Sequence, residues 1–216
     1  MRLVDTRHSM REHIGIFGGT FDPVHNGHSA VARSVQLACS FSRMIWMLGN
    51  SWQKSHVGAP MNHRLSMLYR ATAQCPGHEV GLYEVNRSGS TYTISTVRAL
   101  REKWGYDFPL TVVLGWDSFV GLLTWKDGVD LLREVNLAIV YRDIAPSYLP
   151  DPLSLLWRGR QKHLLHGQCY GVVLDVPMVP VSVSSTHIRN ALRTSDNYSG
   201  LFPDVAAYIS EHDLYR

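Results

Sequence analysis

The stretch GGTFDPVHNGH, which runs from Gly18 to His28, links an apolar segment to a segment with helical spacing of its apolar residues. The apolar segment, His13–Phe17, predicts a buried strand, and Asn26–Cys39 predicts an amphipathic helix. Glycines at the end of a strand let a ligand approach the backbone closely, and the first turn of a helix offers unpaired N–H groups to phosphate oxygens. The stretch therefore predicts a phosphate-binding loop between the first strand and the first helix.

The rest of the chain repeats this alternation of strand-sized apolar runs and longer helical segments. Such alternation predicts an α/β fold with a doubly wound parallel sheet and flanking helices. We expect a single domain over residues 14–216, preceded by a short leader over residues 1–13. The expected strands are His13–Phe17, Arg43–Leu48, Glu79–Val85, Leu110–Leu114, Leu137–Tyr141 and Tyr170–Val176, and the expected helices are Asn26–Cys39, Met61–Gln74, Tyr92–Lys103, Ser184–Leu192 and Asp204–His212.

Composition excludes several classes of protein. In 216 residues, 21 Lys+Arg against 18 Asp+Glu leave a net charge of +3, so we expect no nucleic-acid partner. The basic run Trp157–His166 predicts a solvated helix instead. No apolar run approaches the roughly 18 residues of a membrane span, and no secretory signal is visible, so we expect a cytoplasmic protein without a membrane partner. Three cysteines without CxxC spacing predict free thiols and no structural zinc.

His25 and His28 are three residues apart, so they project to the same side of a first helical turn, where two imidazoles can donate hydrogen bonds to one polyphosphate. An isolated pair with this spacing more often marks a simple turn and a helix end. The whole stretch, however, resembles the nucleotide-binding signature of the nucleotidyltransferase α/β superfamily, whose HxGH is His25-Asn26-Gly27-His28 here.

Within that superfamily, the stretch most resembles bacterial nicotinate mononucleotide adenylyltransferases. Phosphopantetheine adenylyltransferases usually carry Thr at the position of His25. The resemblance implies a Rossmann-like fold and the transfer of an adenylyl group from ATP to nicotinate mononucleotide. It extends from about Ile14 to Tyr215, because the closing segment Tyr208–Tyr215 is similar to the family's YIxxxxLY ending.

A second motif lies near the C-terminus. Val183–Arg189 reads VSSTHIR and resembles the family's ISSTxIR. Because Ser and Thr are favoured N-caps, we expect a helix to begin here, with Arg189 one turn inside and able to bind the β and γ phosphates. Taken alone, the segment is equally compatible with an ordinary capped helix. Together with HxGH, it predicts that two helix starts face the same triphosphate.

The segment from Asn50 to Met67 carries Lys54, which the resemblance assigns to phosphate, followed by Arg64-Leu65-Ser66-Met67, which matches the family's RxxM. The Pro-rich lead-in that the family places before the lysine is absent. Lys54 in solvent and Arg64 in a structural role therefore remain alternatives. Asp22 either orients the HxGH loop or reaches a metal-bound water, and we favour the structural role.

Two further segments resemble the family's substrate-binding motifs. Arg87–Thr96 is similar to RxGxSYTxDTL, with Thr91 in place of Ser and Ser95 in place of Asp, and implies a backbone site for the pyridine carboxylate. Gly115-Trp116-Asp117 resembles the family's GxD, where Asp117 would accept hydrogen bonds from ribose. Trp125, which alone would more often be a core residue, is implied as an aromatic platform for the pyridine ring.

Together these segments imply positioning and charge neutralisation in place of acid–base chemistry. Mg²⁺ is expected on the ATP phosphates, with no metal ligands from the protein. Another adenylyltransferase, specific for nicotinamide mononucleotide or phosphopantetheine, and a non-catalytic nucleotide-binding module remain alternatives. The resemblance implies catalytic roles for His25, His28, Lys54 and Arg189; ATP contacts at Gly18, Gly19, Thr20, Phe21, His25, His28, Gly115, Asp117, Ser185, Thr186 and Arg189; and nicotinate mononucleotide contacts at Thr91, Tyr92, Thr93 and Trp125.

Overall fold

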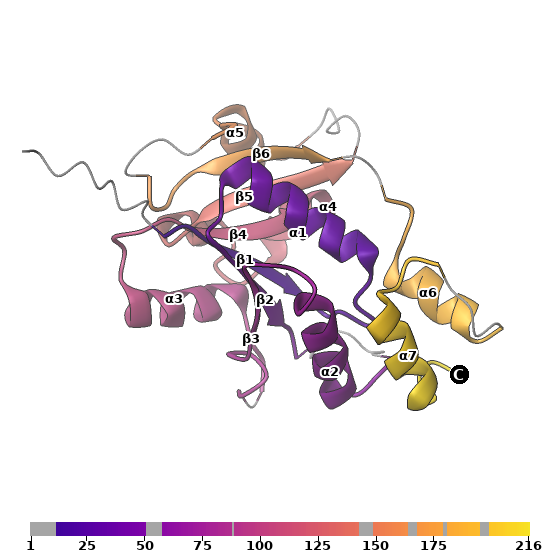
Figure 1. Ribbon diagram of the computed structural model, residues 1–216. Coiled ribbons are helices and arrows are strands. Elements are labelled where there is room, and N and C mark those ends of the chain that lie inside the picture. Colours follow the sequence, from indigo (N-terminus) through magenta and orange to yellow (C-terminus); the bar gives the residue numbers. More distant parts are fainter. Residues whose placement is uncertain are drawn as a thin grey trace, which may run out of the picture.

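The computed structural model describes residues 12–50, 58–87, 89–142, 149–163, 168–178, 181–194 and 199–216. Within these ranges, strands and helices alternate along most of the chain (Figure 1). The strands are β1 (Ile14–Gly19), β2 (Arg43–Leu48), β3 (His78–Gly81), β4 (Leu110–Gly115), β5 (Asn136–Arg142) and β6 (Val173–Met178). The helices are α1 (Asn26–Cys39), α2 (Met61–Thr72), α3 (Thr93–Trp104), α4 (Trp116–Val120), α5 (Leu153–Arg158), α6 (Ser185–Leu192) and α7 (Pro203–Glu211), with two 3₁₀ turns, η1 (Gly121–Thr124) and η2 (Val129–Arg133).

The strands form one parallel sheet in the order β3-β2-β1-β4-β5-β6. β1 lies at the centre, where Ile16 is paired with Ile45 of β2 and with Val112 of β4. The direction of the strand order reverses between β1 and β4, and in a doubly wound sheet the ligand crevice opens at the carboxyl ends of the strands at such a point. The fold class expected from the sequence is confirmed.

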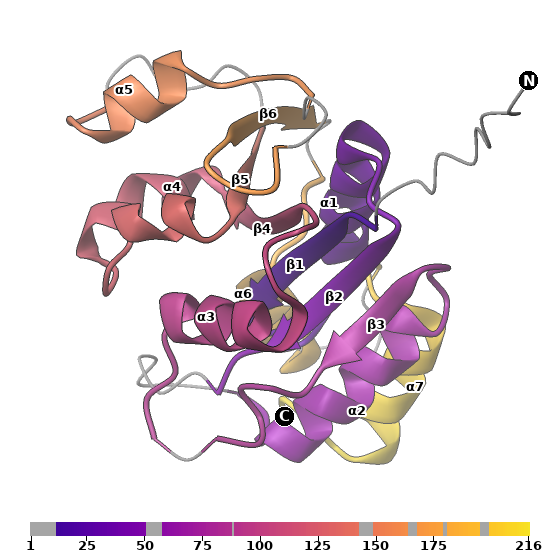
Figure 2. The ribbon, with the colours of Figure 1, turned by 90° about the vertical axis from the view of Figure 1, so that its left-hand side faces the viewer.

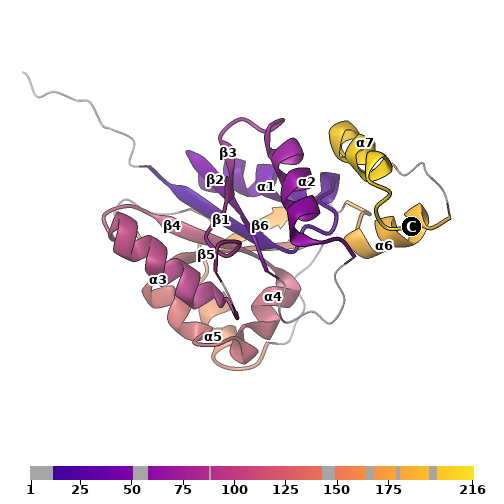
Figure 3. The same cartoon turned by 90° about the horizontal axis from the view of Figure 1, so that it is seen from below.

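Helices cover both faces of the sheet (Figure 2). Successive side chains of a strand point to opposite faces, so neighbouring residues of β1 enter two different cores. Phe17 packs in the core formed with α1, α2, α6 and α7, whereas Ile16 packs in the core formed with α3, α4 and α5. Figures 1 and 3 both show α6 and α7 on the same side of the molecule, next to α2.

Two predicted elements are wrong in their extent. The strand predicted at Glu79–Val85 ends at Gly81, and the following residues form a turn in which Asn86 N–H donates to Leu82 O at 3.1 Å. The strand predicted at Tyr170–Val176 begins only at Val173, because Gly171 has a φ of 88° and interrupts the extended backbone.

The helix predicted at Trp157–His166 is also wrong. Helix α5 ends at Arg158, and Gln161 instead forms a bridge with Leu174 of β6. Gln161 N–H donates to Val173 O at 2.9 Å. The segment that its composition assigned to a solvated helix therefore pairs, at Gln161, with the edge of β6. Residues 164–167 lie outside the described residues.

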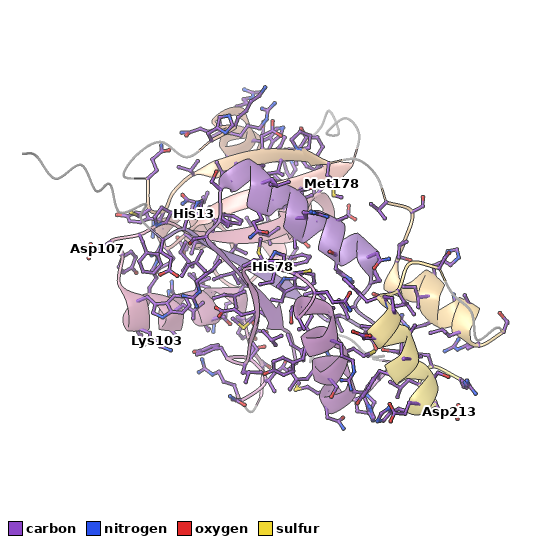
Figure 4. The ribbon with its side chains drawn as sticks, viewed as in Figure 1. His13, His78, Lys103, Asp107, Met178 and Asp213 are labelled. Atoms are coloured by element: carbon purple, nitrogen blue, oxygen red, sulfur yellow. The ribbon has the colours of Figure 1, made fainter. Side chains whose placement is uncertain are left out.

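His13 directly precedes β1 at the amino end of the sheet, and Met178, the last residue of β6, lies on the opposite side (Figure 4). His13 is 8% exposed and its Nε2 lies 2.9 Å from Thr111 Oγ1. Residues 1–11 lie outside the described residues, so the division between a leader and a domain at residue 13 stays a prediction. Among the described helices, none combines the length and apolar character that a membrane crossing requires.

Candidate active site

A cavity of about 460 Å³ opens at the carboxyl ends of the central strands. Its floor is formed by residues of β1 and β4, so it lies where the strand order reverses. It brings together nine of the residues that the sequence resemblance assigned to substrates. These are Gly18 and Gly19 from β1, Thr20 from the loop after it, His28 from the first turn of α1, Gly115 from the end of β4, and Thr91, Tyr92, Thr93 and Trp125.

The HxGH motif forms the start of α1. His25 is the N-cap residue, and its N–H donates to Nδ1 of His28 at 3.2 Å. The two imidazole rings lie 3.8 Å apart between centroids. Because Nδ1 of His28 accepts a hydrogen bond, the proton of the neutral ring resides on Nε2, which makes Nε2 a donor.

The glycine between the two histidines has a steric reason. A Cβ atom at Gly27 would lie 2.9 Å from Cε1 and Nδ1 of the His25 ring and 3.5 Å from Val183 O. Any larger residue would therefore displace the His25 ring, whereas its contact with Val183 O would be at an ordinary van der Waals distance. The motif is therefore a packing requirement as well as a source of donors.

The side chain of Phe21 packs against His28. Its ring is 1% exposed and meets the His28 ring edge to face, with centroids 5.1 Å apart. It also contacts Phe17 and Trp46. Phe21, which the resemblance assigned to ATP, is thus a core residue whose side chain supports His28.

Asp22 connects three parts of the chain. Its carboxylate accepts hydrogen bonds from Gly58 N–H at 2.6 Å, Ala59 N–H at 3.0 Å and the Tyr215 hydroxyl at 2.8 Å. Burial, together with the neighbouring Asp22 carboxylate, raises the pKa of Tyr215, which keeps the phenol protonated as a donor. The structural role that we favoured for Asp22 fits these contacts.

Helix α6 is attached to the same loop. Nη1 of Arg189 donates to Asp22 O at 2.7 Å and lies 3.7 Å from the Asp22 carboxylate. Its Nη2 donates to Thr186 Oγ1 at 3.2 Å, and Ser185 Oγ donates to Pro23 O at 3.0 Å. The expectation that the HxGH segment and the VSSTHIR segment meet in space is confirmed by these bonds.

Arg64 has a structural role. It is 2% exposed, and its guanidinium donates to Thr20 O at 2.8 Å, Gly49 O at 3.1 Å and Ala59 O at 3.2 Å. Burial lowers its pKa. Because the three carbonyl groups belong to the loops after β1 and β2, Arg64 ties those two loops together. Lys54 lies outside the described residues.

The far end of the cavity is formed by the segment before α3, with Tyr92 as its N-cap residue. Glu84 accepts hydrogen bonds from the hydroxyl groups of Thr91 at 3.2 Å and Thr96 at 2.9 Å, and Asn50 Nδ2 donates to Gly89 O at 2.7 Å. Burial raises the pKa of Glu84. Glu84 and Asn50 thus hold this segment against the loop after β2.

The opposite wall at this end is Trp125, which is half-buried at the end of η1, and the exposed Lys126. The ammonium nitrogen of Lys126 lies 4.8 Å from the centroid of the Tyr92 ring. Asp117, in contrast, is exposed in the first turn of α4 and does not line the cavity, although Gly115 and Ser118 do.

The structure adds three residues, in or next to the candidate site, that sequence reasoning missed. Glu84 was assigned to a strand, although a carboxylate within the otherwise apolar run Val80–Val85 was a usable signal. Lys126 stood directly after a residue that was assigned a function. Tyr215 was noted only as part of the closing motif, and nothing in the sequence indicates that its hydroxyl reaches Asp22.

The described residues provide no metal-binding cluster: in those ranges, no three His, Cys, Asp or Glu side chains are placed to hold one ion. The Asp22 carboxylate is already engaged by two N–H groups and a hydroxyl. This donor set fits an ion that is held mainly by phosphate oxygens and water. Binding of Mg²⁺ through ATP stays a prediction.

The strand order and the glycine-rich strand–helix junction with paired histidines define an α/β nucleotidyltransferase. In agreement, the model of the cytidylyltransferase-like family matches residues 16–191. Proteins named "Probable nicotinate-nucleotide adenylyltransferase" are similar over nearly the whole chain. That of Neisseria meningitidis serogroup C is 37% identical over 208 residues, covering 94% of this chain and 98% of the relative. That of Bordetella avium is 33% identical over 207 residues, with the same coverage.

The chain therefore belongs to the nicotinate-nucleotide adenylyltransferase family. Solved structures agree on the fold. The Plasmodium falciparum nicotinic acid mononucleotide adenylyltransferase complexed with NaAD superposes with a TM-score of 0.71 at 18% identity, covering 94% of this chain and 97% of that one. The same enzyme complexed with APC gives a TM-score of 0.68 at 18% identity, with the same coverage.

Proposed function

We propose that this protein transfers the adenylyl group of ATP to nicotinate mononucleotide, forming nicotinate adenine dinucleotide and pyrophosphate. The observation that carries the proposal is the cavity itself, which has His28 and the β1 glycines at one end and Thr91–Thr93 with Trp125 at the other. Such a cavity suits two nucleotides that meet through their phosphates. The names of the relatives support the same substrates.

The reaction requires little proton transfer, because the phosphate of the mononucleotide is already ionised at neutral pH. One of its oxygens forms a bond to the α-phosphorus of ATP while the bond from that phosphorus to the bridging oxygen of the β-phosphate breaks. The electron pair leaves with pyrophosphate. The protein contributes by aligning the reactants and by stabilising the negative charge that develops in the transition state.

The donors for that charge come from both helix starts. His28 offers its Nε2–H group. The other ring nitrogen of His28, Nδ1, accepts a hydrogen bond from the backbone N–H of His25. Arg189, in the second turn of α6, offers the guanidinium N–H groups that do not donate to Asp22 O or Thr186 Oγ1. Lys54 is assigned the same role by its place in the family motif. Magnesium, when bound to the triphosphate, supplies further charge neutralisation.

The test is a pyrophosphate-release assay with ATP and each of three acceptors: nicotinate mononucleotide, nicotinamide mononucleotide and phosphopantetheine. We expect the highest kcat/KM with nicotinate mononucleotide. Turnover with phosphopantetheine alone would select the other adenylyltransferase class, and ATP binding without any turnover would select the non-catalytic alternative. The cytoplasmic location, and the absence of nucleic-acid and membrane partners, stay predictions.

A further inference from the structure

Lys126 places a positive charge at the end of the cavity that the pyridine ring would occupy. It lies in the turn after η1, next to Trp125, and both residues line the cavity. Its Nζ lies 4.8 Å from the centroid of the ring of Tyr92, which also lines the cavity. Among the described residues that line the cavity, it is the only Lys or Arg.

The backbone on the facing side adds a partial positive charge. Tyr92 is the N-cap residue of α3, a helix of 12 residues whose first turn contains no acidic residue. A helix N-terminus carries roughly half a positive elementary charge. Because no carboxylate in that turn offsets it, the field of the helix and the charge of Lys126 have the same sign at Tyr92.

One negative group opposes them. Glu84 also lines the cavity, but its carboxylate oxygens accept hydrogen bonds from the hydroxyl groups of Thr91 and Thr96. Burial raises the pKa of Glu84, while the hydrogen bonds from Thr96 and Thr91 act in the opposite direction. The ammonium group of Lys126 is therefore opposed by a carboxylate that already accepts hydrogen bonds from two hydroxyl groups.

We propose that the ammonium group of Lys126 is a specificity-determining group that favours a pyridine carboxylate over the corresponding carboxamide. The inference rests on the proposed function, because it requires that the pyridine end of the substrate lies between Tyr92 and Trp125. The two substrates have nearly the same shape and differ in one negative charge, so a nearby cation discriminates between them where packing does not.

The experiment compares kcat/KM for nicotinate mononucleotide and nicotinamide mononucleotide in the wild type and in Lys126→Met. We expect the variant to lose about fivefold in kcat/KM with the acid, which corresponds to about 1 kcal/mol, because exposed charge pairs contribute on that scale. The kcat/KM with the amide and the KM for ATP should change less than about twofold. Lys126→Arg should keep the preference, and added salt should weaken it in the wild type.

Lys103 provides a matched control. Its Nζ lies 5.9 Å from the centroid of the Trp104 ring, so it too is a lysine next to an aromatic ring. It lies near the C-terminal end of α3, away from the cavity, and Figure 4 shows it at that end. Lys103→Met should leave both substrates unaffected.

Equilibrium binding of the two mononucleotides, measured by calorimetry, separates the possible failures. Preferential binding of the acid that Lys126→Met abolishes supports the inference even if no turnover occurs, in which case only the proposed reaction is wrong. Turnover in which the variant keeps the wild-type ratio of acid to amide would overturn the inference and leave the reaction intact. Equal losses with both substrates would also overturn it, because they would reduce Lys126 to a packing role. Binding of neither mononucleotide would overturn both.

Discussion

The two ends of the parallel sheet both bury polar side chains, but they use them differently. At the amino end, Arg101 is 2% exposed. Its guanidinium donates to four main-chain carbonyl groups, those of Gly105, Phe108, Glu134 and Cys169. These carbonyl groups belong to segments far apart in the sequence, so Arg101 holds those segments together. The hydrogen bonds of this buried side chain therefore go to the backbone, and its guanidinium also lies over the Tyr106 ring.

At the carboxyl end, the buried carboxylate of Asp22 connects segments that surround the candidate site. Asp22 is bonded to the loop after β2, to Tyr215 near the C-terminus and to Arg189, and its own loop leads into the first turn of α1, which carries His28. A defect here displaces groups that would contact phosphate. The contrast indicates that substitutions at the amino end change stability alone, whereas substitutions at the carboxyl end change turnover.

The largest expected effect is that of His28→Ala at the carboxyl end. Loss of one charge-stabilising donor in the transition state costs about 10²-fold in kcat, or about 3 kcal/mol. Single-turnover measurement of pyrophosphate release gives this rate directly. His163→Ala is the matched control, because His163 belongs to the other HxxH pair of the sequence and is exposed. Equal rates in His28→Ala and the wild type would remove His28 from the mechanism.

Much of the fold was predictable because its signals are local. Helix α1 and strand β2 have the bounds expected from apolar spacing. The short elements α4, η1 and η2, in contrast, were missed, because turns of four or five residues leave no periodic pattern. Gln161 joined the edge of β6 although its neighbours are basic, a long-range pairing that composition does not encode.

The site was predictable where a residue type carries the chemistry and unpredictable where a contact does. His25, Gly27 and His28 form a pattern whose spacing reflects one helical turn. The bond from Tyr215 to Asp22 spans 193 residues, and no local signal announces it. The position of Lys126 over Tyr92 likewise depends on two loops from different strands.

At the amino end of the sheet, the buried His13 should make the free energy of unfolding depend on pH. Burial lowers the pKa of the His13 imidazole from its ordinary value of 6.5 to about 4. As the pH falls, His13 therefore takes up a proton in the unfolded chain before it does so in the folded protein. Its contribution to the free energy of unfolding is fully present above pH 6.5 and is lost as the pH falls toward 4. The loss amounts to about 3 kcal/mol, since one pKa unit corresponds to about 1.4 kcal/mol.

His13→Gln removes this titration while keeping a hydrogen-bonding group for Thr111. Urea denaturation of the wild type and the variant between pH 4 and 7 measures the difference, and kcat at pH 7 should stay within about twofold. His163→Gln controls for an exposed histidine. A variant with the same pH slope as the wild type would show that His13 titrates normally, and a large loss of kcat would contradict the division between the two ends.

The smallest of these effects tests how the carboxyl end is braced. Tyr215→Phe removes one hydroxyl from Asp22 and keeps the ring, so Asp22 holds Arg189 and the loop at Gly58 less firmly. We expect a loss of about tenfold in kcat, or about 1.4 kcal/mol, because a hydrogen bond to a charged group contributes on that scale. Tyr106→Phe is the counterpart at the amino end, where the hydroxyl donates to the Glu134 carboxylate, and it should leave kcat unchanged.

A double-mutant cycle shows whether Tyr215 acts through Arg189 or only stabilises the fold. If Tyr215 is a positioning residue, Tyr215→Phe should reduce kcat in the wild type but add almost nothing in Arg189→Ala, because the group that it positions is already gone. Its effect on the melting temperature should persist in both backgrounds, since the hydroxyl is lost from a buried carboxylate in each. Additive losses in kcat would show that Tyr215 acts independently of Arg189, and the carboxyl end would then be braced in the same structural manner as the amino end.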